Sequence, residues 1–156
     1  MAFAKLSKRA LAIIASCALV LCMGALVACG GKAASYKDGT YTAQSSVYED
    51  SEDGNGNGYG VIEITIKDGK ISAADFKTYE VDGTLKDEDY GKGASGQVSN
   101  QDFYNKAQKA VAACSEYADQ LVSTGHVDAV DVISGATISH DEFVEAANDA
   151  LKQASK

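Results

Sequence analysis

Apolar and polar residues alternate most regularly at residues 62–66, where three isoleucines are separated by Glu63 and Thr65. A two-residue period places every second side chain on the same face, so this segment is predicted to be a half-buried β-strand. Residues 39–46 also alternate and are rich in residues that favour strands. We therefore expect two strands in the first half of the chain.

A third strand is expected directly after the second. Asp68-Gly69 is typical of a hairpin turn, and residues 71–79 are predicted to return antiparallel to the preceding strand. The apolar positions of this returning segment change phase between Ala73 and Phe76. A change of phase within a strand indicates an extra residue, so we expect a β-bulge near residues 74–75.

A helical period follows a polar, glycine-bearing stretch at residues 82–100, which we interpret as a long loop. Asn100 can cap a helix that runs to about Ser123, and Gly125 can end it. The apolar residues of this segment recur at the spacing of one helix face: Phe103, Ala107, Ala110, Val111, Cys114, Ala118 and Leu121.

The end of the chain predicts one more strand and a second helix. Residues 127–133 form a short apolar run that we interpret as a strand. Ser139 and Glu142 have the spacing of a capping box at the start of a helix. The buried face of that helix is expected to hold Phe143, Ala146, Ala147, Ala150 and Leu151. The order β-β-β-α-β-α predicts an α+β fold, in which a small, mostly antiparallel sheet packs with two main helices.

Residues 1–28 have the layout of a secretory signal, in which Lys5, Lys8 and Arg9 precede an almost wholly apolar run. The sequence Leu26-Val27-Ala28-Cys29 resembles a bacterial lipobox, which implies that Cys29 is lipidated and becomes the first mature residue. Residues 29–35 would then form a flexible tether, and residues 36–154 the folded domain. The alternative is an uncleaved anchor, because about 18 apolar residues can just span a bilayer.

The charge of the mature chain limits its partners. The whole chain has a formal net charge of −8, and removing residues 1–28 takes away three basic residues and no acidic one, so the net charge becomes −11. Such a chain repels the phosphates of nucleic acid and of anionic lipids, so neither is expected as a partner. Of the four cysteines, two lie in the signal and Cys29 is the proposed lipid site, which leaves Cys114 without an intramolecular disulfide partner.

Ser134-Gly135-Ala136-Thr137 follows the apolar run at residues 127–133 and precedes the last helix. Thr137 is therefore expected just outside a helix N-terminus, where unpaired N–H groups and the helix dipole favour a phosphate. The same residue types would also serve an ordinary turn, with glycine for the bend and hydroxyls for capping. We call residues 131–137 the acceptor corner.

The acceptor corner, with its acidic residue at Asp131, resembles the acceptor motif of the FMN-binding domain family. Further similarity is carried by the strand at residues 62–66 and by three short segments, Asp38-Gly39-Thr40-Tyr41, Gly58-Tyr59-Gly60 and Lys67-Asp68-Gly69-Lys70-Ile71. The resemblance covers nearly all of residues 36–154. It implies that a flavin transferase joins FMN, through its phosphate, to the hydroxyl of Thr137.

Roles for neighbouring residues follow from this resemblance. Ser134, Gly135 and Ala136 would shape the corner and let the backbone approach the phosphate closely. Asp131 matches the acidic position of the family, which we expect the transferase or its metal to read. We expect Ser139 to hydrogen-bond the phosphate as well as cap the helix, or to cap it only. Tyr59 would lie against the isoalloxazine ring or, as readily, in the core.

Other chemistry has weaker support in the sequence. His140 would be a cation at a helix N-terminus, which is unfavourable, and we interpret it as exposed and idle. Cys114 lies on the apolar helix face and is expected to be a small buried hydrophobe. Two histidines and one mature thiol make a metal site an unconvincing prediction.

These observations predict a lipid-anchored flavoprotein on the extracytoplasmic face of the cell membrane. FMN on Thr137 would pass electrons from a membrane donor to an extracytoplasmic acceptor or reductase, as an electron carrier more than as a stand-alone catalyst. Two alternatives stay open. One is a substrate- or anion-binding sensory lipoprotein without a covalent cofactor, and the other is a structural surface lipoprotein with no cofactor.

Overall fold

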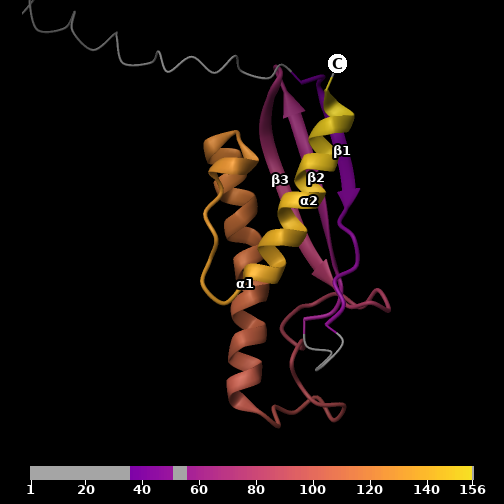
Figure 1. Cartoon of the computed structure of the whole chain (residues 1–156), viewed down its shortest axis with the longest axis vertical. Coiled ribbons are helices and arrows are strands. Elements are labelled where there is room, and N and C mark those ends of the chain that lie inside the picture. The colour runs from indigo at the N-terminus through magenta and orange to yellow at the C-terminus, as the bar shows by residue number, and fades with distance from the viewer. Residues whose placement is uncertain (1–35, 51–55, 156) are drawn as a thin grey trace, which may run out of the picture. The chain divides into compact units, whose positions relative to one another are not determined.

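A three-stranded antiparallel sheet with two long helices packed on it forms the folded part of the chain (Figure 1). The computed structural model describes residues 36–50 and 56–155, so the predicted signal, Cys29 and the tether lie outside the described residues. The strands are β1 (Gly39–Gln44), β2 (Tyr59–Lys67) and β3 (Lys70–Tyr79), and the helices are α1 (Gln101–Thr124) and α2 (Thr137–Ala154). The predicted α+β fold is confirmed.

The central strand, β2, supplies one whole face of the core. Ile62, Ile64 and Ile66 are fully or almost fully buried, as the alternation predicted. The antiparallel neighbours are β1 on one side and β3 on the other. Both helices lie on this apolar face, with α1 mainly against β3 and α2 against β2 and β1.

The expected β-bulge exists but lies earlier in β3 than predicted. Thr65 pairs with Ala73 and Ile66 pairs with Ile71, so Ser72 is the extra residue. Ser72 and Ala73 are both exposed, and the inward positions resume at Ala74. The prediction counted Ala73 as a core residue because alanine is apolar, and this moved the expected bulge toward residues 74–75.

Helix α1 begins and ends as predicted. The side chain of Asn100 accepts a hydrogen bond from the Phe103 N–H at 3.1 Å, which satisfies one of the unpaired donors of the first turn. Gly125 ends the helix in the left-handed conformation, with φ 72°. Residues between β3 and α1 form an irregular loop, as expected, and Gln108 of α1 donates to two carbonyls of that loop.

The segment at residues 127–133 does not form the predicted strand. It consists of a 3₁₀ helix, η1 (Val127–Ala129), followed by extended chain that pairs with no described strand. Val127 and Val130 are both buried, whereas Val132 is 54% exposed. A spacing of three between buried residues belongs to a tight helical turn, and the high strand propensity of valine concealed it.

Helix α2 begins two residues earlier than predicted, and the capping box is wrong. Its first residue is Thr137, and the N-cap Ala136 makes no side-chain capping bond. Ser139 and Glu142 are instead buried, on the face that packs against the sheet and α1. The predicted apolar face from Phe143 to Leu151 is confirmed.

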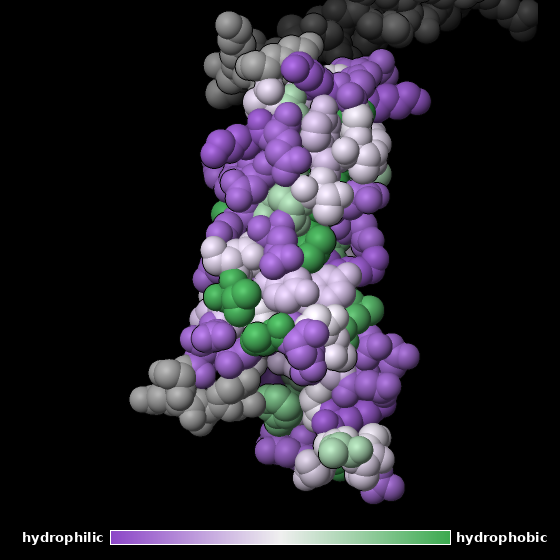
Figure 2. Space-filling view, turned by 90° about the vertical axis from the view of Figure 1, so that its right-hand side faces the viewer, coloured by the Kyte–Doolittle hydropathy of each residue, from purple (hydrophilic) through white to green (hydrophobic). Residues whose placement is uncertain are grey.

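Hydrophilic residues predominate on the face shown in Figure 2, and hydrophobic side chains are scattered among them. Single exposed apolar side chains of this kind are normal on a folded domain. Among the described residues, neither helix has the length and apolar character that crossing a membrane requires.

Candidate functional site

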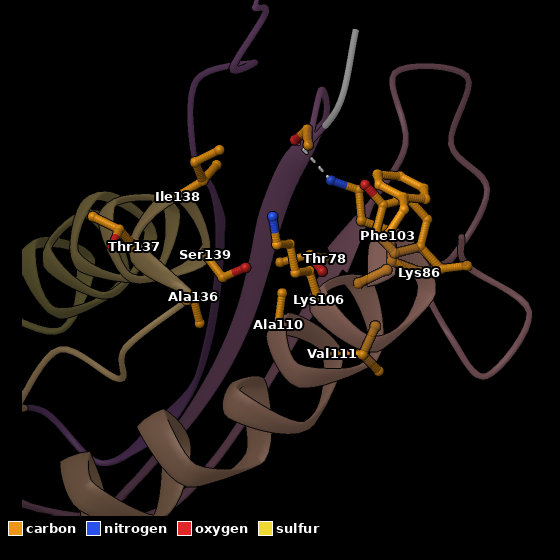
Figure 3. Close-up of a pocket in the computed structure, with 14 residues that line it drawn as sticks. Thr78, Lys86, Phe103, Lys106, Ala110, Val111, Ala136, Thr137, Ile138 and Ser139 are labelled. Carbon is orange, nitrogen blue, oxygen red and sulfur yellow. Dashed lines mark hydrogen bonds between the residues drawn. The ribbon is translucent and has the colours of Figure 1, made fainter. Parts of the chain in front are cut away.

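A pocket opens between the first turn of α2, the first half of α1 and the loop after β3 (Figure 3). Its volume is about 430 Å³, within the usual range for small-ligand pockets. Most of the wall is apolar and comes from four residues of α1, from the N-cap of α2 and from one residue of α2: Phe103, Ala107, Ala110, Val111, Ala136 and Ile138. Three of the apolar residues predicted for the core face of α1 (Phe103, Ala110 and Val111) are only half-buried, because they line this pocket.

The acceptor corner forms one edge of the pocket. Gly135 has φ 86°, a conformation that other residues adopt only with strain, and the chain then turns into α2. Ala136 is buried at 3% exposure, while Ser134 and Thr137 are exposed. The corner thus presents the Thr137 side chain at the surface and at the pocket edge at once (Figure 3).

Tyr117 of α1, which the sequence analysis did not single out, holds the corner in place. Its side chain is fully buried. The hydroxyl donates to the Ala136 carbonyl at 3.1 Å and accepts from the Ile133 N–H at 3.2 Å. One side chain therefore binds the backbone on both sides of the turn that leads to Thr137. The helical period could have placed Tyr117 on the buried face of α1, but it does not show which backbone groups the hydroxyl binds.

Two further side chains fix the preceding residues. Gln120 accepts from the Asp131 N–H at 2.8 Å, and the carboxylate of Asp131 is exposed. His140 Nε2 lies 3.2 Å from the Val130 carbonyl oxygen, and because a carbonyl only accepts, Nε2 carries the proton. The His140 ring also packs edge-on against Tyr117, at 5.3 Å between ring centres. Our interpretation of His140 as exposed and idle is therefore wrong.

The start of α2 at Thr137 makes the corner suitable for an anion. The N–H groups of Thr137, Ile138 and Ser139 have no carbonyl partner within the helix, since the first intrahelical bond of α2 runs from His140 to Ala136. These N–H groups and the helix dipole favour a phosphate at this end of the helix, the dipole by about 0.3–1 kcal/mol.

The remaining predicted site residues divide into two groups. Ser139 is 93% buried and directs its hydroxyl toward the pocket (Figure 3), so it lies with Thr137, Gly135 and Ala136. Tyr59 is elsewhere, because it does not line the pocket and stacks on Tyr79 across the strand pair, at 5.5 Å between ring centres. The fold brings the acceptor corner and Ser139 together and leaves Tyr59 outside.

Basic side chains also surround the pocket, although the chain as a whole is acidic. Lys86, from the loop after β3, and Lys106, from α1, both line it. Lys109 lies one turn further along α1, and its Cδ is 3.5 Å from the place where a Cβ on Gly135 would stand. Lys86 is only 7% exposed and donates to the Gly56 carbonyl at 3.0 Å. Burial lowers the pKa of Lys86, and the carboxylate of Glu142 opposes that shift.

Glu142 is a second buried charge that the sequence analysis missed. It is 4% exposed, and within residues 36–50 and 56–155 neither of its carboxylate oxygens has a hydrogen-bond partner. Burial raises the pKa of Glu142 to about 7, against the opposing effect of Lys86. Its position three residues after Ser139 and four before Ala146 puts it on the buried face, which the helical period could have shown.

Cys114 is buried, as predicted, and lies 3.8 Å from the Thr78 hydroxyl below the pocket. Burial raises the pKa of this thiol to about 11. A thiol that stays protonated is a poor nucleophile and a poor metal ligand, so Cys114 acts as a small packing residue.

One family model and two solved structures are similar to this chain. The model of the FMN-binding domain matches residues 55–152, which include the pocket and the acceptor corner, and the chain belongs to this family. A crystal structure of a Clostridium perfringens protein is similar with a TM-score of 0.54 and 25% identity, over 76% of this chain and 88% of that one. A solution structure of a Clostridium thermocellum protein has 28% identity over 77% of this chain and 93% of that one, with a TM-score of 0.40. No curated protein matches the chain.

The residues of the pocket fit FMN, and the domain is a flavin-binding domain. Apolar walls suit the flat ring of the flavin, and the helix N-terminus with Lys106 suits its phosphate. Thr137 lies at the edge of the same pocket, where the phosphate would be placed.

Proposed function

We propose that this protein is an electron carrier whose FMN is attached covalently to Thr137 outside the cytoplasm. The observation that carries the proposal is the position of one exposed hydroxyl, on the first residue of α2, at the edge of an apolar pocket. The FMN would receive electrons from a membrane donor and pass them to an extracytoplasmic oxidant or reductase. When bound, FMN supplies the electron-transfer chemistry.

Attachment needs an external enzyme, because Thr137 is an unactivated alcohol. No contact between the Thr137 hydroxyl and a basic side chain is found among the described residues, and His140 Nε2 donates to the Val130 carbonyl. In the proposed step, a flavin transferase removes the Thr137 hydroxyl proton, and Oγ1 attacks the phosphorus that carries the flavin in FAD. A new O–P bond forms, the bond to the second phosphate breaks, and AMP leaves. The exposure of Thr137 lets another enzyme reach it.

The chain's own residues then have three tasks. Phe103, Ala107 and Val111 line the wall that would contact the ring and keep water from it. The free N–H groups of the first turn of α2, together with Lys106, would balance the single negative charge of the phosphodiester. Tyr117 fixes the turn, so that the attachment point stays at the pocket edge.

A covalent bond is useful to an exported protein. A non-covalent site of micromolar affinity corresponds to about −8 kcal/mol and would lose its flavin on dilution. The helix dipole adds only about 0.3–1 kcal/mol, which is too little to prevent that loss. Export and covalent attachment therefore support each other.

The location is part of the proposal. The lipobox-like sequence before Cys29 supports an acyl anchor, which would hold the flavin domain at the extracytoplasmic face of the membrane. Replacing Cys29 with alanine should release the protein or stall signal processing. Normal processing with an unchanged membrane fraction would contradict acyl anchoring.

The attachment is tested by expressing the protein together with its transferase and viewing a denaturing gel under ultraviolet light. We expect a fluorescent band for the natural sequence and none for Thr137→Ala. Thr42→Ala is the matched control, because Thr42 is an exposed threonine on β1 that does not line the pocket, and its band should persist. A dark band from the natural sequence, with flavin recovered from the native protein, would favour a non-covalent anion- or flavin-binding lipoprotein.

A further inference from the structure

Glu142 lies on α2 one turn after the pocket residue Ser139, in an environment unusual for a carboxylate. Its side chain is 96% buried and its two oxygens have no hydrogen-bond partner among the described residues. Burying a charge without such partners costs free energy. Carboxyl groups at such places are therefore normally protonated or take part in a functional site. The site residues proposed above do not explain why this position carries a carboxyl group.

The fold leaves room for Glu142 by a specific device. A Cβ on Gly60 of β2 would stand 3.1 Å from the Cβ of Glu142 and 2.6 Å from the ring of Phe76. Only the absence of a side chain at Gly60 lets the helix approach the strand here. Glu142 is thus clamped between α2 and the sheet and has little freedom to turn toward water.

Charged and titratable groups face Glu142 from several elements. Lys86, from the loop after β3, lowers its pKa, and the exposed Asp141 on α2 raises it. Cys114 of α1 and Tyr90 of the loop interact with its charge as well. Next to Glu142, β2 contributes Gly60 and β3 contributes Phe76, neither of which titrates. Lys86 is therefore the only cation among these groups, and it lies too far away to form an ion pair by the usual 4 Å criterion.

Glu142 is linked to the pocket through its neighbours. Lys86 lines the pocket and interacts with Glu142, and Ser139 lines the pocket one turn before Glu142 on the same helix. A charge placed in the pocket would thus be separated from Glu142 by protein side chains more than by water. Electrostatic interactions are stronger through such a medium than through solvent.

We propose that Glu142 takes up a proton when the flavin in this pocket is reduced. The inference rests on the proposed function, since it needs a flavin that cycles between two oxidation states. Two electrons enter the ring from an external reductant, one proton from water binds ring N5, and a second proton from water binds a carboxylate oxygen of Glu142. The ring then gains one negative charge and Glu142 loses one, so the charge of the buried region stays constant. Oxidation returns both protons and both electrons.

Glu142 would hold the proton without contacting the flavin, because it does not line the pocket. The negative charge of the ionised carboxylate would make reduction of the flavin less favourable, and protonation of Glu142 would remove this effect. Lys86 lowers the pKa of Glu142 toward neutral pH, because a nearby cation favours the ionised carboxylate. Removing Lys86 by Lys86→Met should keep Glu142 protonated at higher pH.

The test is infrared difference spectroscopy of the flavin-loaded protein, reduced with dithionite at pH 8. We expect reduction of the natural sequence to produce the C=O band of a protonated carboxyl group. This band should be absent in Glu142→Gln and present in Glu145→Gln. Glu145 is the matched control because it is a glutamate on the same helix, three residues later, and exposed. In the natural sequence the band should disappear at pH 5, where Glu142 is already protonated before reduction.

A second measurement keeps the proposal testable if Glu142→Gln folds poorly. Uptake of a second proton by Glu142 should make the equilibrium constant for reduction of the natural sequence change by a further tenfold per pH unit between pH 7 and 9, beyond the change due to the proton on the flavin. This further change is about 30 mV per pH unit in a two-electron potential. Flavin absorption in the same sample reports the proposed function independently. A flavin that is reduced normally, with no carboxyl band at any pH, would overturn the role of Glu142 and leave the flavin carrier intact.

Discussion

The buried residues at the two ends of α2 differ in their chemistry. The second half buries only apolar groups against the sheet, namely Ala146, Ala147, Ala150, Leu151 and Ala154. The first turn and the residue before it bury Ala136, Ser139 and then Glu142, each below 8% exposure. One end of the helix contributes to stability by removing apolar surface from water, and the other end places polar groups around a pocket.

The comparison separates residues that hold the fold from those that serve the pocket. Phe143 lies at the junction and packs on Phe76 at 5.3 Å and on Tyr117 at 5.6 Å between ring centres. Beyond it toward the C-terminus the packing is apolar. Before it, burial of a carboxylate reduces stability at neutral pH. We infer that the pocket end of α2 is maintained by function at the expense of stability.

The largest effect should come from the apolar junction. Phe143 is fully buried, so Phe143→Ala removes its contacts and leaves a cavity. We expect a loss of about 3–5 kcal/mol in the free energy of unfolding, measured by urea denaturation. Phe103→Ala, in the half-buried pocket wall, is the control and should cost much less. Equal losses from the two variants would show that the helix end and the pocket wall do not differ as described.

The next effect should come from Glu142 and depend on pH. Because the folded-state pKa is about 7, above the ordinary 4.5, the folded state binds the proton more tightly than the unfolded state. The free energy of unfolding therefore falls as pH rises from about 4.5 to 7 and then levels off. The loss is on the order of 3 kcal/mol, at about 1.4 kcal/mol per pKa unit.

The variant Glu142→Gln isolates this contribution. Its free energy of unfolding should equal or fall below that of the natural sequence near pH 4.5 and exceed it at pH 8. Chemical denaturation of the flavin-free protein at several pH values measures the difference. A difference between the two proteins that does not change with pH would mean that Glu142 titrates like an exposed glutamate.

A smaller effect is expected for Tyr117→Phe. The substitution keeps the ring and removes the hydroxyl that binds the Ala136 carbonyl and the Ile133 N–H. Leaving these two backbone groups, one buried and one partly buried, without a partner should cost about 1–3 kcal/mol. The same variant should be flavinylated more slowly, because the turn before Thr137 is held less firmly. Unchanged stability together with unchanged flavinylation would rule out the proposed role of Tyr117.

The smallest effect should come from the far end of α1. Asn100→Ala removes the capping bond to the Phe103 N–H, which should cost about 1 kcal/mol. Thermal denaturation measures the loss, and flavin attachment should be unaffected because the cap takes no part in the acceptor corner. Weaker attachment in this variant would indicate that the start of α1 helps to shape the pocket.

Regular patterns in the sequence predicted most of the fold. The alternation at residues 62–66 and the helical period after Asn100 reflect burial against one core, so both elements are confirmed. The segment at residues 127–133 failed because valines that are spaced for a helical turn also have high strand propensity. The capping box failed because Ser139 and Glu142 have the right spacing for a cap while facing the core.

The site was predictable only where a motif marked it. The motif led to the acceptor corner, which the fold places at the edge of the pocket, but Lys86, Tyr117 and Glu142 carry no such mark. The helical period could have placed Tyr117 and Glu142 on buried helix faces. Lysine is normally a surface residue, so the burial of Lys86 in a loop becomes visible only when distant segments are brought together. Tyr59 was chosen for its aromatic ring, and in the structure that ring stacks on Tyr79.

Intact-mass spectrometry of the protein isolated from its natural host would detect a flavin bound to Thr137. We expect a mass equal to the mature peptide and its acyl groups plus one FMN less one water, with the flavin-bearing peptide containing Thr137. A mass explained by the peptide and acyl groups alone would contradict covalent attachment.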